Sequence, residues 1–541
     1  MSEGGPAGGG APRSTVRRGE GAAPADTARA VWLSAATMSS RVLGLVRDQL
    51  FAILVGANRF SDAFVVAFRI PNLLRDLFAE GALSSAFVPV FAETRRNRGD
   101  PAAHRLADAM VALVLLVVGV LTLLGIVFAD GVVHAIAPGV LEPGLAGHLA
   151  RVMMPFLLLV SLAAVAMGML NAEGRFAAPA LAPTLFNVGS ITVGAGLWIA
   201  GWPPERAVVG WAVGTMLGGL LQLLVQLPSL AGLGHMPRPR LARGDLADAG
   251  LRRIGRLMGA AVIGLSATQV NILVNTWFAS HQEGAPTWLQ MAFRLMQLPL
   301  GVFGVAIATV AGAGVAQRAA ARDLPAVRET IGSAMRLVAF LNVPSAVGLA
   351  VLATPIISMI YQHGRFGAAD SVATGDALVC YALGLYAYSG VKVLAPAFYA
   401  LDEPRVPVLA SFAGMAANVG LNAALWPVLG HRGVALGTSL AAWVNFAVLT
   451  WAFRRDHGGF GNAHLLRQLG VVLAACLPMA AAAWGAHEAL ARLALQGLSR
   501  QLALGLAPVL AGGLAYLGAA RLLRLAELGE LAGALRRRRR G

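Results

Sequence analysis

The stretch "SSRVLGLVRDQL", residues 39–50, places charges inside a segment that is otherwise apolar enough to be a membrane helix. It contains Arg41, Arg47 and Asp48. The next apolar segment repeats the pattern with "FRIPNLLRDLFAEGA", residues 68–82. One such charge at the centre of a bilayer costs ~2.5–3.5 kcal/mol even on insertion scales. Charges at this density therefore indicate that these helices face a polar cavity or one another.

The whole chain has the composition of a polytopic helical membrane protein. Of its 541 residues, 57% are hydrophobic and 13% are charged, and its mean hydropathy is +0.67. Soluble domains carry about 25% charged residues, so this composition excludes a soluble globular protein. The apolar runs are long enough for helices of about 20 residues, the length that crosses a bilayer. We therefore predict an all-α polytopic membrane protein with fourteen transmembrane helices.

Arginine-rich loops alternate along the chain with loops that contain no Arg or Lys. The arginine-rich loops occupy residues 93–105, 238–256 and 317–336. The loops at residues 130–148 and 281–286 contain neither residue. Because positively charged loops stay in the cytoplasm, we expect the arginine-rich side and both termini to be cytoplasmic. This distribution explains most of the formal net charge of +16 without a nucleic-acid partner.

The second half of the chain resembles the first at a near-constant offset. Three pairs of segments match with offsets of 225, 223 and 229 residues: 67–74 with 292–299, 211–219 with 434–442, and 171–179 with 400–408. A near-constant offset indicates an internal duplication, and chance similarity between apolar helices is the alternative. Two parallel six-helix repeats that face each other would enclose a central cavity, the usual frame for alternating access.

These patterns divide the chain into five parts. We predict a disordered N-terminal tail, an N-lobe with the first six spans, a C-lobe with the next six, two extra helices and a basic cytoplasmic tail. The boundaries are residues 1–26, 27–233, 247–455, 463–524 and 525–541. The five arginines at 536–540 suit anionic lipid headgroups, and a solvated basic tail is the alternative.

Spacing along the charged helices predicts which side chains meet. Arg41 and Asp48 are seven residues apart, so they share one face of a helix. Asp62 and Arg69 are also seven apart, and we expect them to form a structural ion pair. A proline then interrupts the helix, so the direction of Arg75 cannot be projected from a straight helix.

The acidic residues are too few to pair every arginine in the spans. Arg294 has no acidic residue within several positions, and Lys392 is the only lysine in the chain. Several guanidinium groups around one cavity suit an anion with many oxygens, such as a diphosphate. The alternative is that these charges form ion pairs between the lobes or lie at headgroup depth. We predict substrate contacts at Arg41, Arg47, Arg75 and Arg294, with supporting charges at Asp48, Asp62, Arg69 and Lys392.

The charged spans resemble the signature region of the MurJ (MviN) family of lipid II flippases. The resemblance runs from about residue 28 to residue 455, whereas the last two expected spans match only in hydropathy. Its most specific segments are residues 39–93, "APGV" at 137–140, "NAEGRFAAPALAPTLFN" at 171–187, "FRLMQLPLGVFGVAIAT" at 293–309, "GRF" at 364–366 and "KVLAPAFYALDEPRVPV" at 392–408.

The resemblance implies a transporter of the MOP superfamily and not an enzyme. Such a protein flips lipid II, the undecaprenyl-diphosphate-linked peptidoglycan precursor, across the bacterial cytoplasmic membrane. It implies no cofactor and a monomer, with the cell-wall synthesis machinery as a candidate contact. In related proteins the two extra helices form a lipid-filled groove. The family's functionally important charges match Arg41, Arg47, Asp48, Asp62, Arg75 and Arg294.

The sequence departs from the family pattern beside Arg294. Many members carry an acid or Asn where this chain has Phe293, and Gln297 occupies another position that is often acidic. The end of the same span, "VAGAGVAQRA", lacks a common Leu-Pro. These departures leave a local partner for Arg294 in doubt.

Other functions and the energy source stay open. Another MOP exporter, for an oligosaccharide lipid or a drug, is the nearest alternative, although arginines in the first two spans argue against a cationic drug. A membrane enzyme acting on prenyl phosphates needs a nucleophile or an acid–base pair, and the short loops offer none. The coupling cation is unknown. Its candidate residues in the second half are Asn271, Asn275, Asp376, Asn418, Asn422 and Thr438.

Overall fold

The computed structural model describes residues 24–77, 83–242, 244–493 and 497–529, which form helices and no strand. Most of the expected N-terminal tail, the run of five arginines and Glu80 lie outside these residues. The first helix begins at Pro24, so it starts slightly earlier than the expected end of the tail.

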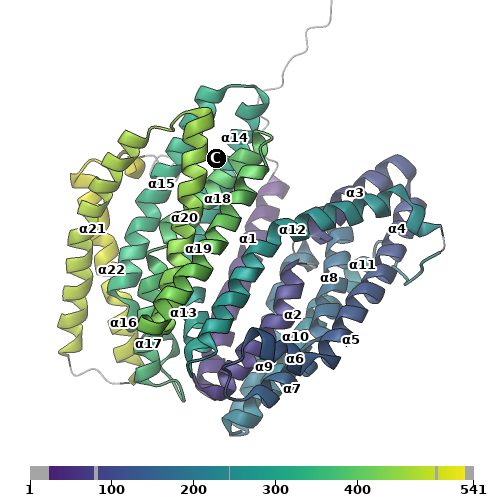
Figure 1. Ribbon diagram of the computed structural model, residues 1–541, viewed down its shortest axis with the longest axis horizontal. Coiled ribbons are helices and arrows are strands. Elements are labelled where there is room, and N and C mark those ends of the chain that lie inside the picture. The colour runs from purple at the N-terminus through teal and green to yellow at the C-terminus, as the bar shows by residue number, and fades with distance from the viewer. Residues whose placement is uncertain (1–23, 78–82, 243, 494–496, 530–541) are drawn as a thin grey trace, which may run out of the picture.

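The first half of the chain forms the helices α1 to α11, in dark colours in Figure 1. Two of them are linked by a π-helical turn, η2. Their bounds are α1 Pro24–Val55, α2 Arg59–Leu74, α3 Ser84–Arg98, α4 Asp100–Leu113, η2 Val114–Val118, α5 Gly119–Val127, α6 Ala129–Ile136, α7 Pro143–Met153, α8 Pro155–Ala172, α9 Ala177–Ile199, α10 Pro204–Leu224 and α11 Leu227–Ala231.

The second half forms α12 to α20, and α21 and α22 pack along one side of it (Figure 1). A 3₁₀ turn, η3, precedes α12, and a π-helical turn, η4, links α13 to α14. The bounds are η3 Asp245–Ala247, α12 Ala249–Ala279, α13 Ala285–Pro299, η4 Leu300–Gly304, α14 Val305–Ala320, α15 Leu324–Val351, α16 Ala353–Tyr361, α17 Ala368–Ala382, α18 Leu385–Ala400, α19 Arg405–Leu429, α20 His431–His457, α21 Asn462–Ala491 and α22 Gly497–Leu522.

Eleven helices in the described part of the chain are long and apolar enough to cross a membrane, or twelve if the bent pair α17–α18 is one span. The charged helices α1 and α2 are not among the eleven. The structure therefore shows the expected all-α polytopic membrane fold. The count of fourteen spans stays a prediction.

The hydrophobic cluster that joins many helices of both halves lies at one end of the molecule. One cluster combines Phe51 and Trp211 of the first half with Met296 and Tyr361 of the second. A second cluster lies in the first half together with the beginning of α12, and a third lies in the second half. The helix ends in the shared cluster adjoin the loops that lack Arg and Lys. The halves are thus packed together at that end, whereas toward the arginine-rich loops only the beginning of α12 packs into the core of the first half and the rest of the second half has a core of its own.

Two loops close the contact at the shared end. The backbone N–H of Arg365 donates to the carbonyl of Ile53 at 3.2 Å, and its Nη1 donates to the carbonyl of Leu54 at 3.2 Å. The N–H of Gly139 donates to Oγ of Ser280 at 3.2 Å. The segments "GRF" and "APGV" supply these contacts. Both segments carry the family resemblance, but their sequences alone did not predict these contacts.

Asp62 of α2 caps the first turn of α13, which corrects its expected pairing with Arg69. Its carboxylate accepts hydrogen bonds from the N–H of Gly284 at 2.6 Å and of Thr287 at 3.2 Å, and from Oγ1 of Thr287 at 2.7 Å. Asp62 forms no ion pair with Arg69, whose buried Nε has no partner in the described protein. The first N–H groups of a helix lack internal partners and carry partial positive charge, so a carboxylate satisfies them well. The N-terminal turn of α13, and not Arg69, is therefore the partner of Asp62.

We predict that Asp62→Ala destabilises the protein by about 1–3 kcal/mol, because it leaves buried donors of α13 without partners. Thermal unfolding of purified variants in detergent measures the effect. The control is Asp130→Ala, which removes an exposed ion pair with Arg151 that contributes about 0–1 kcal/mol.

Since Asp62 and Arg69 do not pair, the effects of Asp62→Asn and Arg69→Gln on the free energy of unfolding should add. A double variant that is less destabilised than either single variant would show that Asp62 and Arg69 do form an ion pair.

Candidate functional site

Asp48 lies between two guanidinium groups that come from different halves of the chain. Its Oδ1 accepts from Nε and Nη2 of Arg47, at 3.1 and 2.8 Å. Its Oδ2 accepts from Nε of Arg294 at 2.7 Å. Arg294 therefore has an acidic partner, 246 residues away, although none exists near it in the sequence. We call Arg47, Asp48 and Arg294 the arginine–aspartate cluster.

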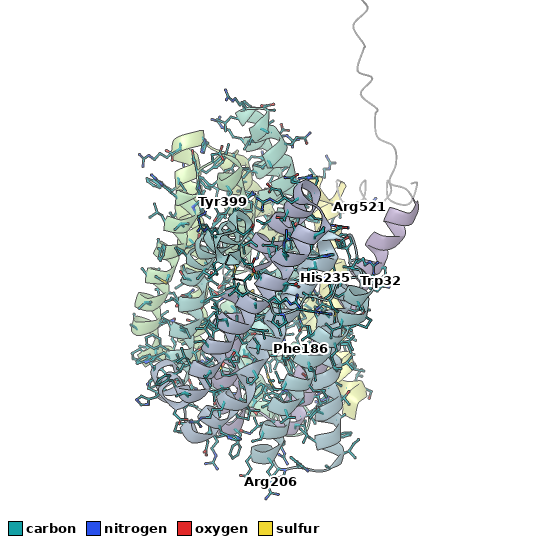
Figure 2. All side chains as sticks on the ribbon, turned by 90° about the vertical axis from the view of Figure 1, so that its right-hand side faces the viewer. Trp32, Phe186, Arg206, His235, Tyr399 and Arg521 are labelled. Atoms are coloured by element: carbon teal, nitrogen blue, oxygen red, sulfur yellow. The ribbon has the colours of Figure 1, made fainter. Side chains whose placement is uncertain are left out.

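The position of this cluster follows from the packing of α1 against α9. Asn187 of α9 donates from Nδ2 to the carbonyl of Ser40 at 3.0 Å, which fixes α1 beside the first half. Two turns further along α1, the guanidinium of Arg47 lies 5.4 Å from the centre of the Phe186 ring. Phe186 lies at mid-height of the molecule in Figure 2. A cation–π contact of about 0.5–2 kcal/mol thus orients Arg47 toward Asp48.

The second half supplies Arg294 from α13, the helix that Asp62 caps at its beginning. Arg294 uses only Nε to bind Asp48. Its two Nη groups make no hydrogen bond within the described residues, and 43% of its side chain is exposed. The cluster carries two positive charges and one negative charge. It therefore has a net positive charge and N–H donors available to a further anion.

Arg41 lies one to two turns before the cluster on α1, beside η4 of the second half. A Cβ built on Gly301 would come within 2.5 Å of the Arg41 Nη1, so any side chain at this position would shift the guanidinium from its place. Arg41 is exposed and forms no ion pair or hydrogen bond with the described part of the chain. All of its donors are available to a ligand.

Arg75, whose direction could not be projected from the sequence, is paired with an acidic neighbour. Its Nε and Nη2 donate to Oδ1 of the neighbouring Asp76, at 3.2 and 2.9 Å. The helix continues through Pro71 and turns π-helical at residues 75–77. Arg75 is therefore already bound to a carboxylate. Lys392 on α18 is exposed and forms no ion pair within the residues described.

A neutral polar network lies among α12, α19 and α20, away from this cluster. Asn275 donates to Oγ1 of Thr438 at 3.0 Å, and Asn422 donates to the side-chain oxygens of Asn275 at 2.7 Å and Asn418 at 3.1 Å. The network contains no carboxylate. The acidic candidate, Asp376, instead forms an ion pair with Arg432. Oδ1 of Asn422 is buried without a hydrogen-bond partner, but a network of neutral side chains by itself identifies no coupling cation.

Comparisons with known proteins connect this geometry with one family. The family model "Lipid II flippase MurJ" matches residues 51–500. A probable lipid II flippase MurJ of Vibrio cholerae is 37% identical over 432 residues, which cover 77% of this chain and 81% of that protein. The lipid II flippase MurJ of Burkholderia cenocepacia is 36% identical over 436 residues, which cover 78% and 83%.

Solved structures agree with the sequence comparisons. A structure described as lipid II flippase MurJ in an inward closed conformation matches with a TM-score of 0.75 and 25% identity, and covers 91% of this chain and 98% of that one. An inward-facing multidrug resistance MATE family transporter of the MOP superfamily matches with a TM-score of 0.65 and 17% identity, over 81% and 99% of the two chains, and shares the fold alone. On these grounds, this chain belongs to the MurJ family of lipid II flippases.

Proposed function

We propose that this protein moves lipid II from the inner to the outer leaflet of the bacterial cytoplasmic membrane, and that its arginines bind the diphosphate. The arginine–aspartate cluster is the observation that carries the proposal. It is cationic, it lies between the two halves, and both Nη groups of its Arg294 are free of hydrogen bonds to the described residues. The prenyl tail would stay in lipid while the diphosphate crosses between the halves.

The chemistry of the cluster suits a diphosphate better than a singly charged anion. The Asp48 carboxylate already occupies the space between two guanidinium groups. A diphosphate carries more negative charge and more acceptor oxygens, so it can bind the free donors of Arg41 and Arg294 while Asp48 keeps Arg47 in place. Bidentate, charge-assisted hydrogen bonds of this type are the strong ones in proteins. Arg75, held by Asp76, would contribute as a further donor.

Contacts between the halves support a two-repeat transporter with fourteen spans. Asp62 and Thr287 are 225 residues apart, the offset that relates the segments 67–74 and 292–299, and they hydrogen-bond to each other. Residues at equivalent positions of two repeats meet where a pseudo-twofold axis passes. Such an axis would run along the membrane normal, since six spans return a repeat to the same side. During alternating access, the ends of α2 and α13 that meet at this axis would move apart and come together again.

The orientation follows from the charges of the loops. The arginine-rich loops lie at the end opposite to the hydrophobic cluster that both halves share, and we place that end and both termini in the cytoplasm. The closed end then faces outward, and the cluster is reached from the cytoplasm. Both halves of the site come from one chain, so a monomer suffices, and contact with cell-wall synthesis proteins is not required for transport.

We predict that Arg294→Lys fails to replace the wild-type protein in cells depleted of their own lipid II flippase. Lysine cannot hold Asp48 through one nitrogen and a diphosphate through two others. Loss of one charge-assisted hydrogen bond, ~1.5–3 kcal/mol, should leave about a tenth of the flipping activity or less. The measurement is the exposure of lipid II on the outer face of the cells. The matched control is Arg318→Lys at the exposed end of α14, and normal exposure with Arg294→Lys would remove Arg294 from the site.

We predict that Gly301→Val acts like Arg41→Ala and abolishes flipping while the protein still inserts. The new side chain would occupy the space of the Arg41 guanidinium and displace it from the cavity side of α1. Gly264→Val in α12 is the control, because a Cβ at Gly264 meets nothing within 4 Å. Complementation and membrane yield are measured for all three variants. Wild-type growth with Gly301→Val would show that the position of Arg41 does not matter for transport.

A further inference from the structure

Tyr361, the last residue of α16, has a hydroxyl group that is buried without a hydrogen-bond partner among the described residues. The exposed fraction of this residue is 0%, and its ring packs in the hydrophobic cluster that both halves share, with 6.0 Å between its centre and that of the Phe366 ring. Buried tyrosine hydroxyls usually have a partner, because leaving one unpaired costs free energy. Phenylalanine would fill the same space without this cost, so the hydroxyl itself requires an explanation.

The hydroxyl lies near the arginine–aspartate cluster. The phenol interacts electrostatically with Asp48, Arg294 and Arg47, and most strongly with Asp48. Of these three side chains, only the carboxylate can accept a hydrogen bond from Tyr361. Arg47 donates to one oxygen of this carboxylate, and Arg294 donates to the other. The acceptor that the hydroxyl lacks is thus close by, but both of its oxygens are bound to other donors.

The chain that follows Tyr361 closes the contact between the halves at the closed end. We call residues 362–367 the closing loop. The N–H of His363 donates to the carbonyl of Tyr361 at 2.7 Å, which folds the loop tightly against the end of α16. The N–H of Arg365 then donates to the carbonyl of Ile53, near the end of α1, at 3.2 Å. Tyr361 therefore adjoins the cluster through its side chain and the closing loop through its backbone.

Two glycines allow the closing loop to lie directly on the end of α1. Gly364 has a φ of +60°, and a Cβ there would lie 2.6 Å from the carbonyl oxygen of Ile53. Gly56 has a φ of +79°, and a Cβ there would lie 2.7 Å from the carbonyl oxygen of Arg365. Only glycine adopts such φ values without steric cost. The two backbones are therefore in direct contact, and a shift of the loop along α1 breaks the hydrogen bond between them.

The cluster and the contact with the closing loop lie on the same helix, so a movement of Tyr361 affects both. Asp48 and Ile53 are five residues apart on α1, which is ~7.5 Å at the rise of an α-helix. A movement that brings the hydroxyl of Tyr361 to Asp48 also draws the closing loop along α1 and away from Ile53. The hydrogen bond from Tyr361 to Asp48 and the hydrogen bond from the loop to Ile53 are therefore alternatives.

We propose that Tyr361 couples the binding of the diphosphate to the opening of the closed end, a role that rests on the proposed function. Arg294 first holds Asp48 and the diphosphate together. As the diphosphate moves toward the closed end, Arg294 follows it, and the hydroxyl of Tyr361 takes its place on Oδ2 of Asp48. This movement releases the closing loop from α1. The ligand favours the open state because the new hydrogen bond exists only there. Tyr361 is a positioning residue, since it acts through Asp48 and not on the substrate.

The matched variants Tyr361→Phe and Tyr386→Phe test the role of the hydroxyl. Tyr386 is also buried, and its hydroxyl also lacks a partner in the described structure, but it lies in the core of the second half. Neither variant should lower the melting temperature in detergent, since each removes an unpaired buried group. Tyr361→Phe should slow the appearance of lipid II on the outer face of cells about tenfold, through the loss of one hydrogen bond to a charged group. Tyr386→Phe should keep the wild-type rate, and equal rates for the two variants would overturn the proposal.

A second measurement separates this coupling from the binding of the diphosphate. Spin labels at Gly144 of the first half and Ala369 of the second report the opening, because both positions are exposed and lie at the closed end. The two native cysteines, Cys380 and Cys476, are replaced by alanine. With undecaprenyl diphosphate at saturation, the distance between the labels should lengthen in the wild-type protein and in the control variant, but not in Tyr361→Phe.

The outcomes of this measurement distinguish the two proposals. A lengthened distance in the variant without the Tyr361 hydroxyl would overturn the coupling and leave the proposed function intact. A wild-type protein that does not bind undecaprenyl diphosphate, as measured by native mass spectrometry, would overturn the proposed function and the coupling with it.

Discussion

The carboxylate of Asp48 is the contact on which the central site depends. It lies between Arg47 and Arg294, and without it two guanidinium groups would face each other in a partly buried place with no counter-charge. Removing one partner of such a group costs several kcal/mol, because the remaining charges lose their compensation. The pair of bonds also ties α1 of the first half to α13 of the second. The same interaction therefore sets the charge of the site and holds α1 and α13 at a fixed distance from each other.

The two halves of the chain are packed together in different ways at the two ends of the molecule. At the closed end, the halves share a hydrophobic cluster, and Asp62 caps α13 from α2. At the arginine-rich end, the core of the first half includes the beginning of α12, whereas the remaining helices of the second half have their own core, so these helices can separate from the first half there without exposing shared apolar surface. Hydrogen bonds from a carboxylate to a helix terminus are polar contacts that water can replace. Opening the closed end therefore requires the shared apolar cluster to separate as well as these hydrogen bonds to break.

The sequence predicted the fold class and the charged helices, but it did not predict most partners. Long apolar runs report on membrane helices directly, because the bilayer imposes their length. Spacing rules apply only within one straight helix, so they placed Asp62 beside Arg69 and left Arg294 alone. The actual partners are Gly284, Thr287 and Asp48, which come from other helices more than 200 residues away. No local pattern contains that information, and a neighbouring acid such as Asp76 was overlooked because adjacent residues normally point apart in an α-helix.

The two proposed repeats also explain why the site is asymmetric. Arg69 and Arg294 are related by the offset of 225 residues, yet only Arg294 reaches a carboxylate. At the same offset, the position that matches Asp48 is Leu273, so the second repeat offers Arg69 no equivalent acid. A duplication would have produced the arrangement of helices twice, whereas only the first repeat carries the charged residues of α1. An asymmetric site suits an amphiphilic substrate, because one side must bind a diphosphate while the other must leave a path for an apolar chain.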